Sequence, residues 1–426
     1  MVRKPATKSM SLDLILRHAT ITGRTAPVDI GVRGGVIVEI APWIEAQAQE
    51  IAADGRLVTA GLVDTHVHLD KSCIAGRCNC QSGTLQEAIA SVAEIKRGFT
   101  EDDIYQRGRR TLEKAILQGT NRMRTHVEVD PRIGLKGFHA VRALRQEYRW
   151  AIDLQICVFP QEGLLNDPGA DALLVEACEN GADLIGGCPY VDSDPQGQIA
   201  RIFDLATRFD IDIDFHLDFD LDPSWMHLDE VCRQTERHRR GGRVAAGHVT
   251  KLSAVSPEHL AVIGTRLANT GVALTTLPAT DLFLMGAGHT HNVPRGVAPL
   301  HRLIAAGVSC SLATNNVLNP FTPFGDCSLI RMANLYANIM QIGTSAGLET
   351  CFEMITSQPA RLMRLDDYGI AVGRPADLVM LDAMTSADAI AEIAPPLLGL
   401  RQGHMTFSRP SAELLRPAKL HAVGNS

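Results

Sequence analysis

Short apolar runs alternate with amphipathic segments through the middle of the chain. Eight of the runs have the length of buried strands, and they lie at residues 62–69, 122–129, 154–159, 184–188, 211–217, 243–249, 272–277 and 309–314. Segments with the apolar spacing of helices lie between them, for example at 85–96, 102–117, 172–179, 199–208 and 257–269. Eight strands that alternate with helices predict an α/β fold of the (β/α)8 TIM-barrel type. A doubly wound open sheet is the alternative, although no GxGxxG motif follows a predicted strand.

Both ends of the chain have the alternating pattern of strands. The predicted strands and hairpins lie at 12–16, 19–22, 29–40, 376–382 and 398–407. The two hairpins are expected to turn at Gly34-Gly35 and at Gly403. We therefore expect one small β-sandwich domain formed by both termini. The predicted division is 1–59 for its N-terminal part, 60–365 for the barrel and 366–426 for its C-terminal part.

Composition narrows the class of protein. The 426 residues are 45% hydrophobic and 21% charged, which excludes a disordered chain. The net charge is −7 at pH 7 without a basic stripe, so no nucleic-acid partner is expected. A small-molecule enzyme fits these properties best.

The N-terminal segment and the cysteines indicate the compartment. The basic residues 1–10 are not followed by an unbroken apolar run, because Asp13 and Arg17 interrupt it. No secretory signal and no membrane partner are predicted, and a cytoplasmic location with reduced thiols is expected. Of the ten cysteines, only Cys78 and Cys80 form a close pair. We interpret this pair as incidental, with metal or redox chemistry as the alternative.

Histidines gather at the predicted carboxyl ends of the strands, where barrel enzymes place their catalytic groups. His66 and His68 alternate with apolar residues, so both imidazoles point to one face of the first strand. His216 and Asp218 share a face of the fifth strand, and His248 ends the sixth. An isolated pair with this spacing is typical of solvated or hydrogen-bonded histidines. Four histidines on three strand ends instead favour a metal site, and imidazole ligands suit Zn or Fe.

Two other polar residues near strand ends have structural alternatives. Gln161 follows the third strand, and its amide can pair with the donor–acceptor edge of a substrate amide or lactam. The alternative is a turn or helix-start residue. His126, in the second strand, is interpreted as structural.

These motifs resemble those of the amidohydrolase superfamily over nearly the whole chain. Residues 57–71 are similar to the signature of its first barrel strand, and residues 368–379 to its return to the β domain. Within the superfamily the chain is most similar to bacterial cytosine deaminase and N-isopropylammelide hydrolase. The segments that carry this similarity are 124–130, 159–163, 214–216, 247–248 and 319–325.

The resemblance implies one divalent metal ion, Zn or Fe, with His66, His68 and His216 as ligands. His248 would hydrogen-bond the metal-bound water or the substrate, and Gln161 would hold the amide edge of a heterocycle. The lysine that becomes carboxylated in binuclear relatives has no counterpart near residues 184–189, so a mononuclear site is implied. The implied partner is a small heterocyclic substrate, and a homo-oligomer is expected by analogy.

Asn315 departs from the family pattern at the end of the eighth strand, where the family has a metal-ligating aspartate that moves a proton. An amide cannot take that proton, but its carbonyl oxygen can still bind the metal. One hypothesis is a deliberately inactivated Asp→Asn variant. The other is a natural protein with altered chemistry, in which Asp218, Asp281 or His248 is the base.

Phe219 is the second departure, because cytosine deaminase has a glutamate at this position. An apolar wall favours a bulkier or N-substituted substrate, and Asp218 is then the candidate proton donor. Gln161, Phe219, Asp281 and Phe321 are predicted to line the substrate pocket, with core packing as the alternative for Phe321.

The leading hypothesis is a metal-dependent hydrolase of C–N bonds, a deaminase or cyclic-amide hydrolase that acts on a small nitrogen heterocycle. The alternative is a non-catalytic metal and heterocycle binder that has lost its base.

Overall fold

The chain forms an eight-stranded barrel in the computed structural model, which describes residues 11–78 and 80–415. Neighbouring barrel strands run parallel and follow the order of the sequence. They are β6 (Leu62–Val67), β7 (Thr120–Glu128), β8 (Asp153–Phe159), β9 (Leu184–Ile185), β10 (Asp212–Leu217), β11 (Val244–His248), β12 (Val272–Thr276) and β13 (Cys310–Leu312). The predicted (β/α)8 barrel is confirmed.

The barrel closes between its first and last strands. Val67 forms a parallel bridge with Asn315. The backbone N–H of Asn315 donates to the carbonyl of His66 at 2.8 Å, and that of His68 donates to the carbonyl of Asn315 at 3.0 Å. Closure satisfies backbone groups that an open edge would leave unpaired. It also brings two of the predicted metal ligands beside Asn315.

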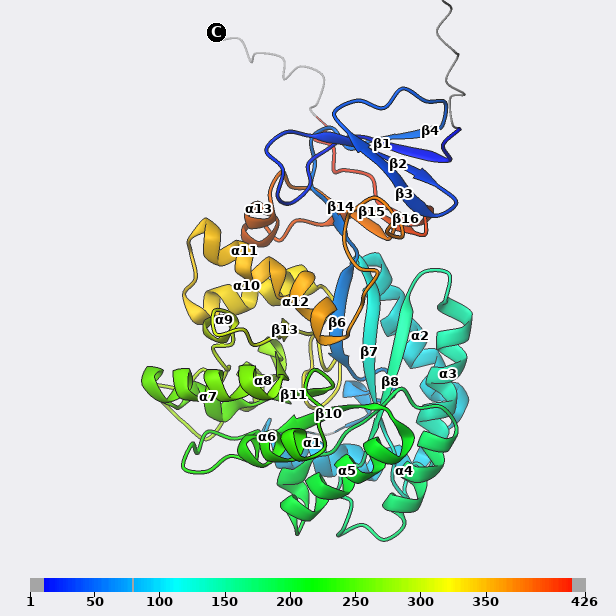
Figure 1. The fold of residues 1–426 in the computed structure, drawn as a ribbon. Coiled ribbons are helices and arrows are strands. Elements are labelled where there is room, and N and C mark those ends of the chain that lie inside the picture. Colours follow the sequence, from blue (N-terminus) through cyan, green and yellow to red (C-terminus); the bar gives the residue numbers. More distant parts are fainter. Residues whose placement is uncertain (1–10, 79, 416–426) are drawn as a thin grey trace, which may run out of the picture.

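Helices cover the outside of the barrel (Figure 1). They include α2 (Glu101–Leu117), α3 (Lys136–Tyr148), α4 (Ala170–Glu179), α5 (Pro195–Phe209), α6 (Leu228–Arg237), α7 (Pro257–Thr270), α8 (Pro278–Leu284), α9 (His301–Ile304), α10 (Leu329–Met340), α11 (Ser345–Glu353) and α12 (Ser357–Leu362). The main core lies between these helices and the strands. α5 begins four residues before its predicted start, because Asp194 accepts a hydrogen bond from Gly197 and Pro195 occupies the first helical position.

The two ends of the chain form a separate β sandwich, as predicted. One sheet has the order β3-β2-β1-β4 and the other β16-β15-β14-β5. Their strands are β1 (Leu14–Ala19), β2 (Val28–Arg33), β3 (Val36–Ala41), β4 (Gln49–Ala52), β5 (Val58–Ala60), β14 (Leu378–Leu381), β15 (Pro396–Arg401) and β16 (His404–Ser408). A shared apolar core joins the sheets, with Ile30 from the first and Leu398 from the second. α13 (Ser386–Ala391) lies between β14 and β15.

The predicted hairpins have the turns that their glycines suggest. β2 and β3 pair next to the turn at Gly34 and Gly35, whose φ angles are 58° and 79°. β15 and β16 pair around Gly403, with a φ of 74°. Glycine adopts such positive φ angles without steric cost. The exact domain boundaries after residues 59 and 365 stay a proposal.

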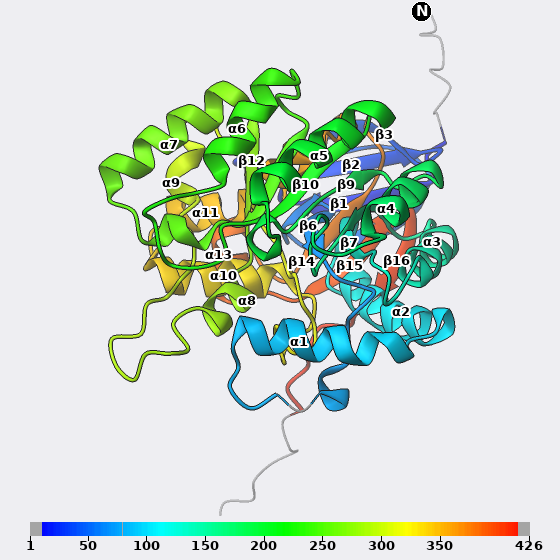
Figure 2. The ribbon, with the colours of Figure 1, turned by 90° about the horizontal axis from the view of Figure 1, so that it is seen from below.

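One helix lies at the end of the barrel remote from the β sandwich (Figures 1 and 2). This helix, α1 (Leu85–Ile95), runs directly into the short helix η2 (Lys96–Gly98). Val92 of α1 belongs to an apolar cluster that also contains Phe219 and Phe321. The cluster therefore connects α1 to two residues predicted to line the site.

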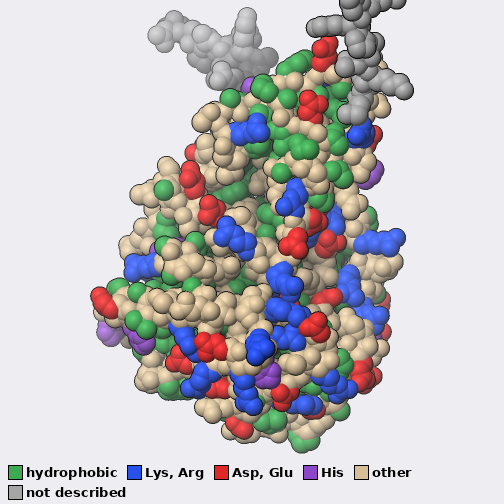
Figure 3. Space-filling model, viewed as in Figure 1, with side chains coloured by type: hydrophobic (Ala, Val, Ile, Leu, Met, Phe, Trp, Pro, Cys, Tyr) green, Lys and Arg blue, Asp and Glu red, His purple; other side chains and the backbone are tan. Residues whose placement is uncertain are grey.

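Figure 3 shows one face of the molecule, on which basic and acidic side chains are interspersed. Among the residues that the structure describes, no helix is long and apolar enough to cross a membrane. The ten cysteines are free thiols. The basic segment 1–10, and Asn79 between Cys78 and Cys80, lie outside the described residues.

Candidate active site

Three histidines meet at the carboxyl end of the barrel. His66 belongs to β6, His68 follows that strand by one residue, and His216 belongs to β10. The Nε2 atom of His216 lies 3.0 Å from that of His66 and 3.2 Å from that of His68. All three side chains are buried. Burial, together with the neighbouring basic groups, lowers the pKa of each well below its usual value. The three imidazoles are therefore neutral, with their Nε2 atoms facing one point.

This geometry fits one divalent metal ion. For Zn–N bonds of about 2.0–2.1 Å, tetrahedral ligands lie about 3.3 Å apart, close to the 3.0 and 3.2 Å found here. The Nδ1 atoms of the three rings have no hydrogen-bond partner in the described part of the chain. Neutral imidazole is the form that binds a metal. The two predicted strand-end motifs are thus brought together as expected from their spacing.

A fourth histidine supports the cluster from the side. The His126 ring stacks on that of His66 at a centroid distance of 3.7 Å. Its Nε2 lies 3.6 Å from the Asp214 carboxylate, which accepts a hydrogen bond from Arg124 at 2.7 Å. This placement agrees with the structural interpretation of His126, because the residue packs against a ligand candidate.

His248 lies next to the cluster, with its ring centroid 5.6 Å from that of His216, and is held by a carboxylate. Its Nδ1 is 2.7 Å from Oδ1 of Asp281, and both side chains are buried. The other Asp281 oxygen accepts hydrogen bonds from the backbone of Leu277 and the hydroxyl of Thr276. Burial raises the pKa of Asp281. A carboxylate at Nδ1 leaves the Nε2 lone pair of His248 free toward the site. Asp281 thus contacts His248, and its role in binding substrate stays a prediction.

Asn315 supplies a buried amide beside the histidines. Its side chain is fully buried, and neither amide atom has a hydrogen-bond partner among residues 11–78 and 80–415. Its φ is 57°, a conformation that asparagine tolerates better than most residues. An unpartnered buried amide is costly unless a ligand satisfies it. The carbonyl oxygen is therefore available to the metal site, as the sequence suggests.

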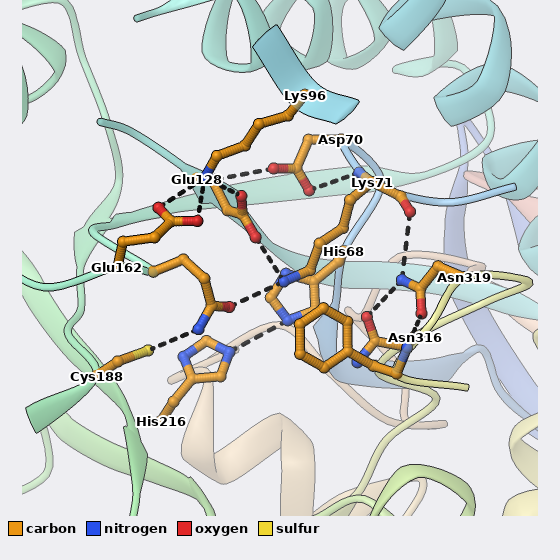
Figure 4. A network of polar contacts seen from close by, with 12 residues as sticks. His68, Asp70, Lys71, Lys96, Glu128, Glu162, Cys188, His216, Asn316 and Asn319 are labelled. Carbon is orange, nitrogen blue, oxygen red and sulfur yellow. Dashed lines mark hydrogen bonds and ion pairs between the residues drawn. The ribbon is translucent and has the colours of Figure 1, made fainter. Parts of the chain in front are cut away.

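Gln161 contacts Lys71, a residue that sequence reasoning missed and that Figure 4 shows beside Glu128. Oε1 of Gln161 accepts a hydrogen bond from Lys71 at 3.0 Å, and its Nε2 donates to Sγ of Cys188 at 3.7 Å. Lys71 also donates to Glu128 at 2.7 Å. Burial alone would raise the pKa of Glu128, but Lys71 and Lys96 lower it to about 2. The signal in the sequence was a lysine three residues after His68, together with polar residues at the ends of the next two strands, Glu128 and Gln161.

Two aromatic rings form apolar walls. Phe219 stacks on His248 at a centroid distance of 3.7 Å, and Phe321 lies 4.4 Å from the Lys71 ammonium. Such a distance allows a cation–π contact. Both rings belong to the apolar cluster that includes α1.

Asp218 does not lie where the alternating pattern placed it. β10 ends at Leu217, and Asp218 has a φ of 50°, so the alternation of faces stops before it. Its carboxylate accepts hydrogen bonds from the backbone N–H groups of His227 and Leu228 at 2.9 and 3.0 Å. These contacts stabilise the start of α6 and leave neither oxygen free to donate a proton. They favour a structural role for Asp218.

Asp218→Asn is therefore expected to lower stability rather than turnover. The amide can accept at only one of the two positions, and the unpaired N–H costs about 1–2 kcal/mol. Thermal unfolding should show a lower Tm, while kcat should stay within about threefold of the parent. A 100-fold loss of kcat at unchanged Tm would instead support proton donation by Asp218.

The fold combines a (β/α)8 barrel with a β sandwich from both termini. The barrel carries histidines on its first, fifth and sixth strands. Together these features define the class of metal-dependent hydrolases. The sequence model of the Amidohydrolase family matches residues 122–403. The chain belongs to this family and is a hydrolase of C–N bonds.

Relatives cover almost the full chain. It is 28% identical to N-isopropylammelide isopropyl amidohydrolase of Pseudomonas sp. (strain ADP), over 93% of this chain and 98% of that protein. It is also 28% identical to pterin deaminase of Rhizobium rhizogenes, over 90% of each chain. Among solved structures, the fold is similar to that of 5-methylcytosine deaminase from Klebsiella pneumoniae liganded with 5-fluorocytosine. The superposition of the two chains has a TM-score of 0.90 at 29% sequence identity. It covers 95% of this chain and 100% of that one.

Proposed function

We propose that the chain is a deaminase or cyclic-amide hydrolase that acts on a small nitrogen heterocycle. One divalent ion, Zn or Fe, would be held by His66, His68, His216 and the amide oxygen of Asn315. One observation carries this proposal. The Nε2 atoms of three histidines converge beside the buried amide of Asn315, which has no hydrogen-bond partner among the described residues. The relatives named above act on N-isopropylammelide, pterin and 5-methylcytosine, which supports a heterocyclic substrate.

The chain's own residues provide the proton transfers. A bound divalent ion would supply a water activated for nucleophilic attack near neutral pH. Because Asn315 cannot accept a proton, we assign the base to His248, whose Nε2 is left free by the Asp281 contact at Nδ1. The imidazolium that forms is stabilised by the buried Asp281 carboxylate. The same Nε2–H can then donate to the leaving nitrogen.

Gln161 and Lys71 position the substrate. The Gln161 amide offers one donor and one acceptor, the complement of a lactam or amide edge. The Lys71 ammonium can donate to a ring carbonyl oxygen. Phe219 and Phe321 give the ring apolar walls, which supports a bulkier or N-substituted heterocycle over cytosine itself.

The test is metal analysis combined with a screen of cyclic amides and amino-heterocycles, on the parent chain and on Asn315→Asp. With His248 as base, the parent should turn over substrate in a metal-dependent way. Aspartate at 315 should change kcat by less than about tenfold. Chelation should abolish activity, and full activity of metal-free protein would refute the proposal.

Two other outcomes separate the alternatives. Activity that appears only in Asn315→Asp would identify the chain as an inactivated variant. Tight binding of a heterocycle without turnover in both proteins would favour a non-catalytic binder. Assembly as a homo-oligomer stays a prediction from the resemblance, and a cytoplasmic location stays a prediction from the N-terminal segment and the cysteines.

A further inference from the structure

A cluster of buried charges lies beside the histidines, and only part of it enters the proposed chemistry. The ammonium of Lys96 lies 2.8 Å from Glu128, 2.5 Å from Asp130 and 2.6 Å from Glu162. Glu128 ends β7, whereas Asp130 and Glu162 lie in the loops after β7 and β8. The Lys96 side chain is only 2% exposed. One cation thus joins three acids from two strand ends.

The cluster continues into the substrate side of the site (Figure 4). Glu128 uses its second oxygen, Oε1, to accept from Lys71 at 2.7 Å. Lys71 contacts Gln161 at 3.0 Å, and Gln161 contacts Cys188 at 3.7 Å. These contacts form an unbroken polar path between Lys96 and Cys188. Cys188 is completely buried.

Lys96 also marks the junction between α1 and the barrel. Lys96 is the first residue of η2 and directly follows Ile95, the last residue of α1. Ala88 and Val92 of α1 are buried, and Leu85, Ile89 and Ile95 pack partly buried against the same apolar cluster. The ion pairs of Lys96 add a polar attachment to this apolar one at the carboxyl end of α1.

The chemistry of an ammonium suits this position. The Lys96 ammonium has three N–H donors and no acceptor, and three carboxylates surround it. Without it, the three acids would lie within reach of one another, and among the described residues the other basic side chains paired with them are Lys71 at Glu128 and Arg132 at Asp130 and Glu162. Buried like charges separate or take up protons. Either response would alter the carboxylate of Glu128 that holds Lys71.

We propose that Lys96 is a positioning residue that fixes Lys71 and Gln161 through Glu128 and fastens the end of α1 to the barrel. The substrate contacts of Lys71 and Gln161 rest on the proposed function. The polar path itself does not depend on it, so the path can be tested without a substrate.

Cys188 provides the reporter. Lys96→Met should release Gln161 from its fixed position and let a small reagent reach the neighbouring thiol. Alkylation of Cys188 by iodoacetamide, followed by peptide mass spectrometry, is expected to be at least about tenfold faster than in the parent. Cys310 and Cys351, buried in β13 and α11, should react at unchanged rates.

Arg266→Met is the matched control. It also removes one cation from an ion pair, with Glu236 at 2.8 Å, but on the exposed surface of α7. The Cys188 rate should not change in this variant. If Lys96→Met does not fold, Lys96→Met/Glu162→Gln, which removes one charge of each sign, is measured in its place with the same expectation.

Two results would overturn the proposal. One is a Cys188 rate within about twofold of the parent in the Lys96 variants. The other is a parallel rise at Cys310, which would indicate general loosening of the fold. Once a substrate is known, the Lys96 variants should raise KM more than they lower kcat. Failure to find a substrate would count against the proposed function and leave the labelling result intact.

Discussion

His216→Ala is expected to release the metal ion and to lower kcat/KM by about 10³-fold or more. His216 is the imidazole whose Nε2 lies within 3.2 Å of both other ligand candidates, so its loss leaves two nitrogens on one side of the site. Two neutral imidazoles and one amide oxygen bind a divalent ion weakly. Metal content after dialysis, together with kcat/KM, measures the effect.

His139→Ala is the control, because it removes an exposed histidine of α3 that contacts Glu101. Metal content and kcat/KM should equal those of the parent. A full equivalent of tightly held metal in His216→Ala would contradict the assigned ligand set.

Asp281→Asn is expected to lower kcat by about 10²–10⁴-fold with metal content unchanged. The carboxylate requires the proton of His248 to lie on Nδ1, whereas an amide can donate to Nδ1 and shift that proton to Nε2. The atom that faces the site would then lack a lone pair. The variant would also lose the negative charge that stabilises the imidazolium.

Asp218→Asn is the matched comparison, since it makes the same chemical change in a buried carboxylate next to another strand end. Only Asp281→Asn should reduce kcat strongly. If kcat of Asp281→Asn stayed within about threefold of the parent, His248 would not be the base. Another group would then have to accept the proton of the attacking water.

The barrel was predictable because its strands are short, continuous apolar runs, which buried parallel strands require. The ligand candidates were predictable for a related reason. Barrel geometry brings the carboxyl ends of all strands together, so His66 and His216 had to approach each other even though 150 residues separate them.

The errors and omissions share a physical origin. Alternation predicts the face of a residue only while the strand continues, and the chain leaves β10 just before Asp218. The Lys96 contacts join residues 32 to 66 positions apart through side chains alone. No periodicity reports such pairs, because each charged residue taken singly is typical of a solvated surface.

The β sandwich has a consequence for synthesis on the ribosome. β5 pairs with β14, yet residues 61–377 of the chain separate the two strands. At about 5–20 residues per second, translation of that stretch takes roughly 15–60 s. During this interval β5 and the apolar face of the first sheet lack their partners, and the barrel itself can close only after β13 and Asn315 have been made. The nascent chain thus carries an open strand edge until its last strands emerge, and this is the period in which chaperone protection matters most.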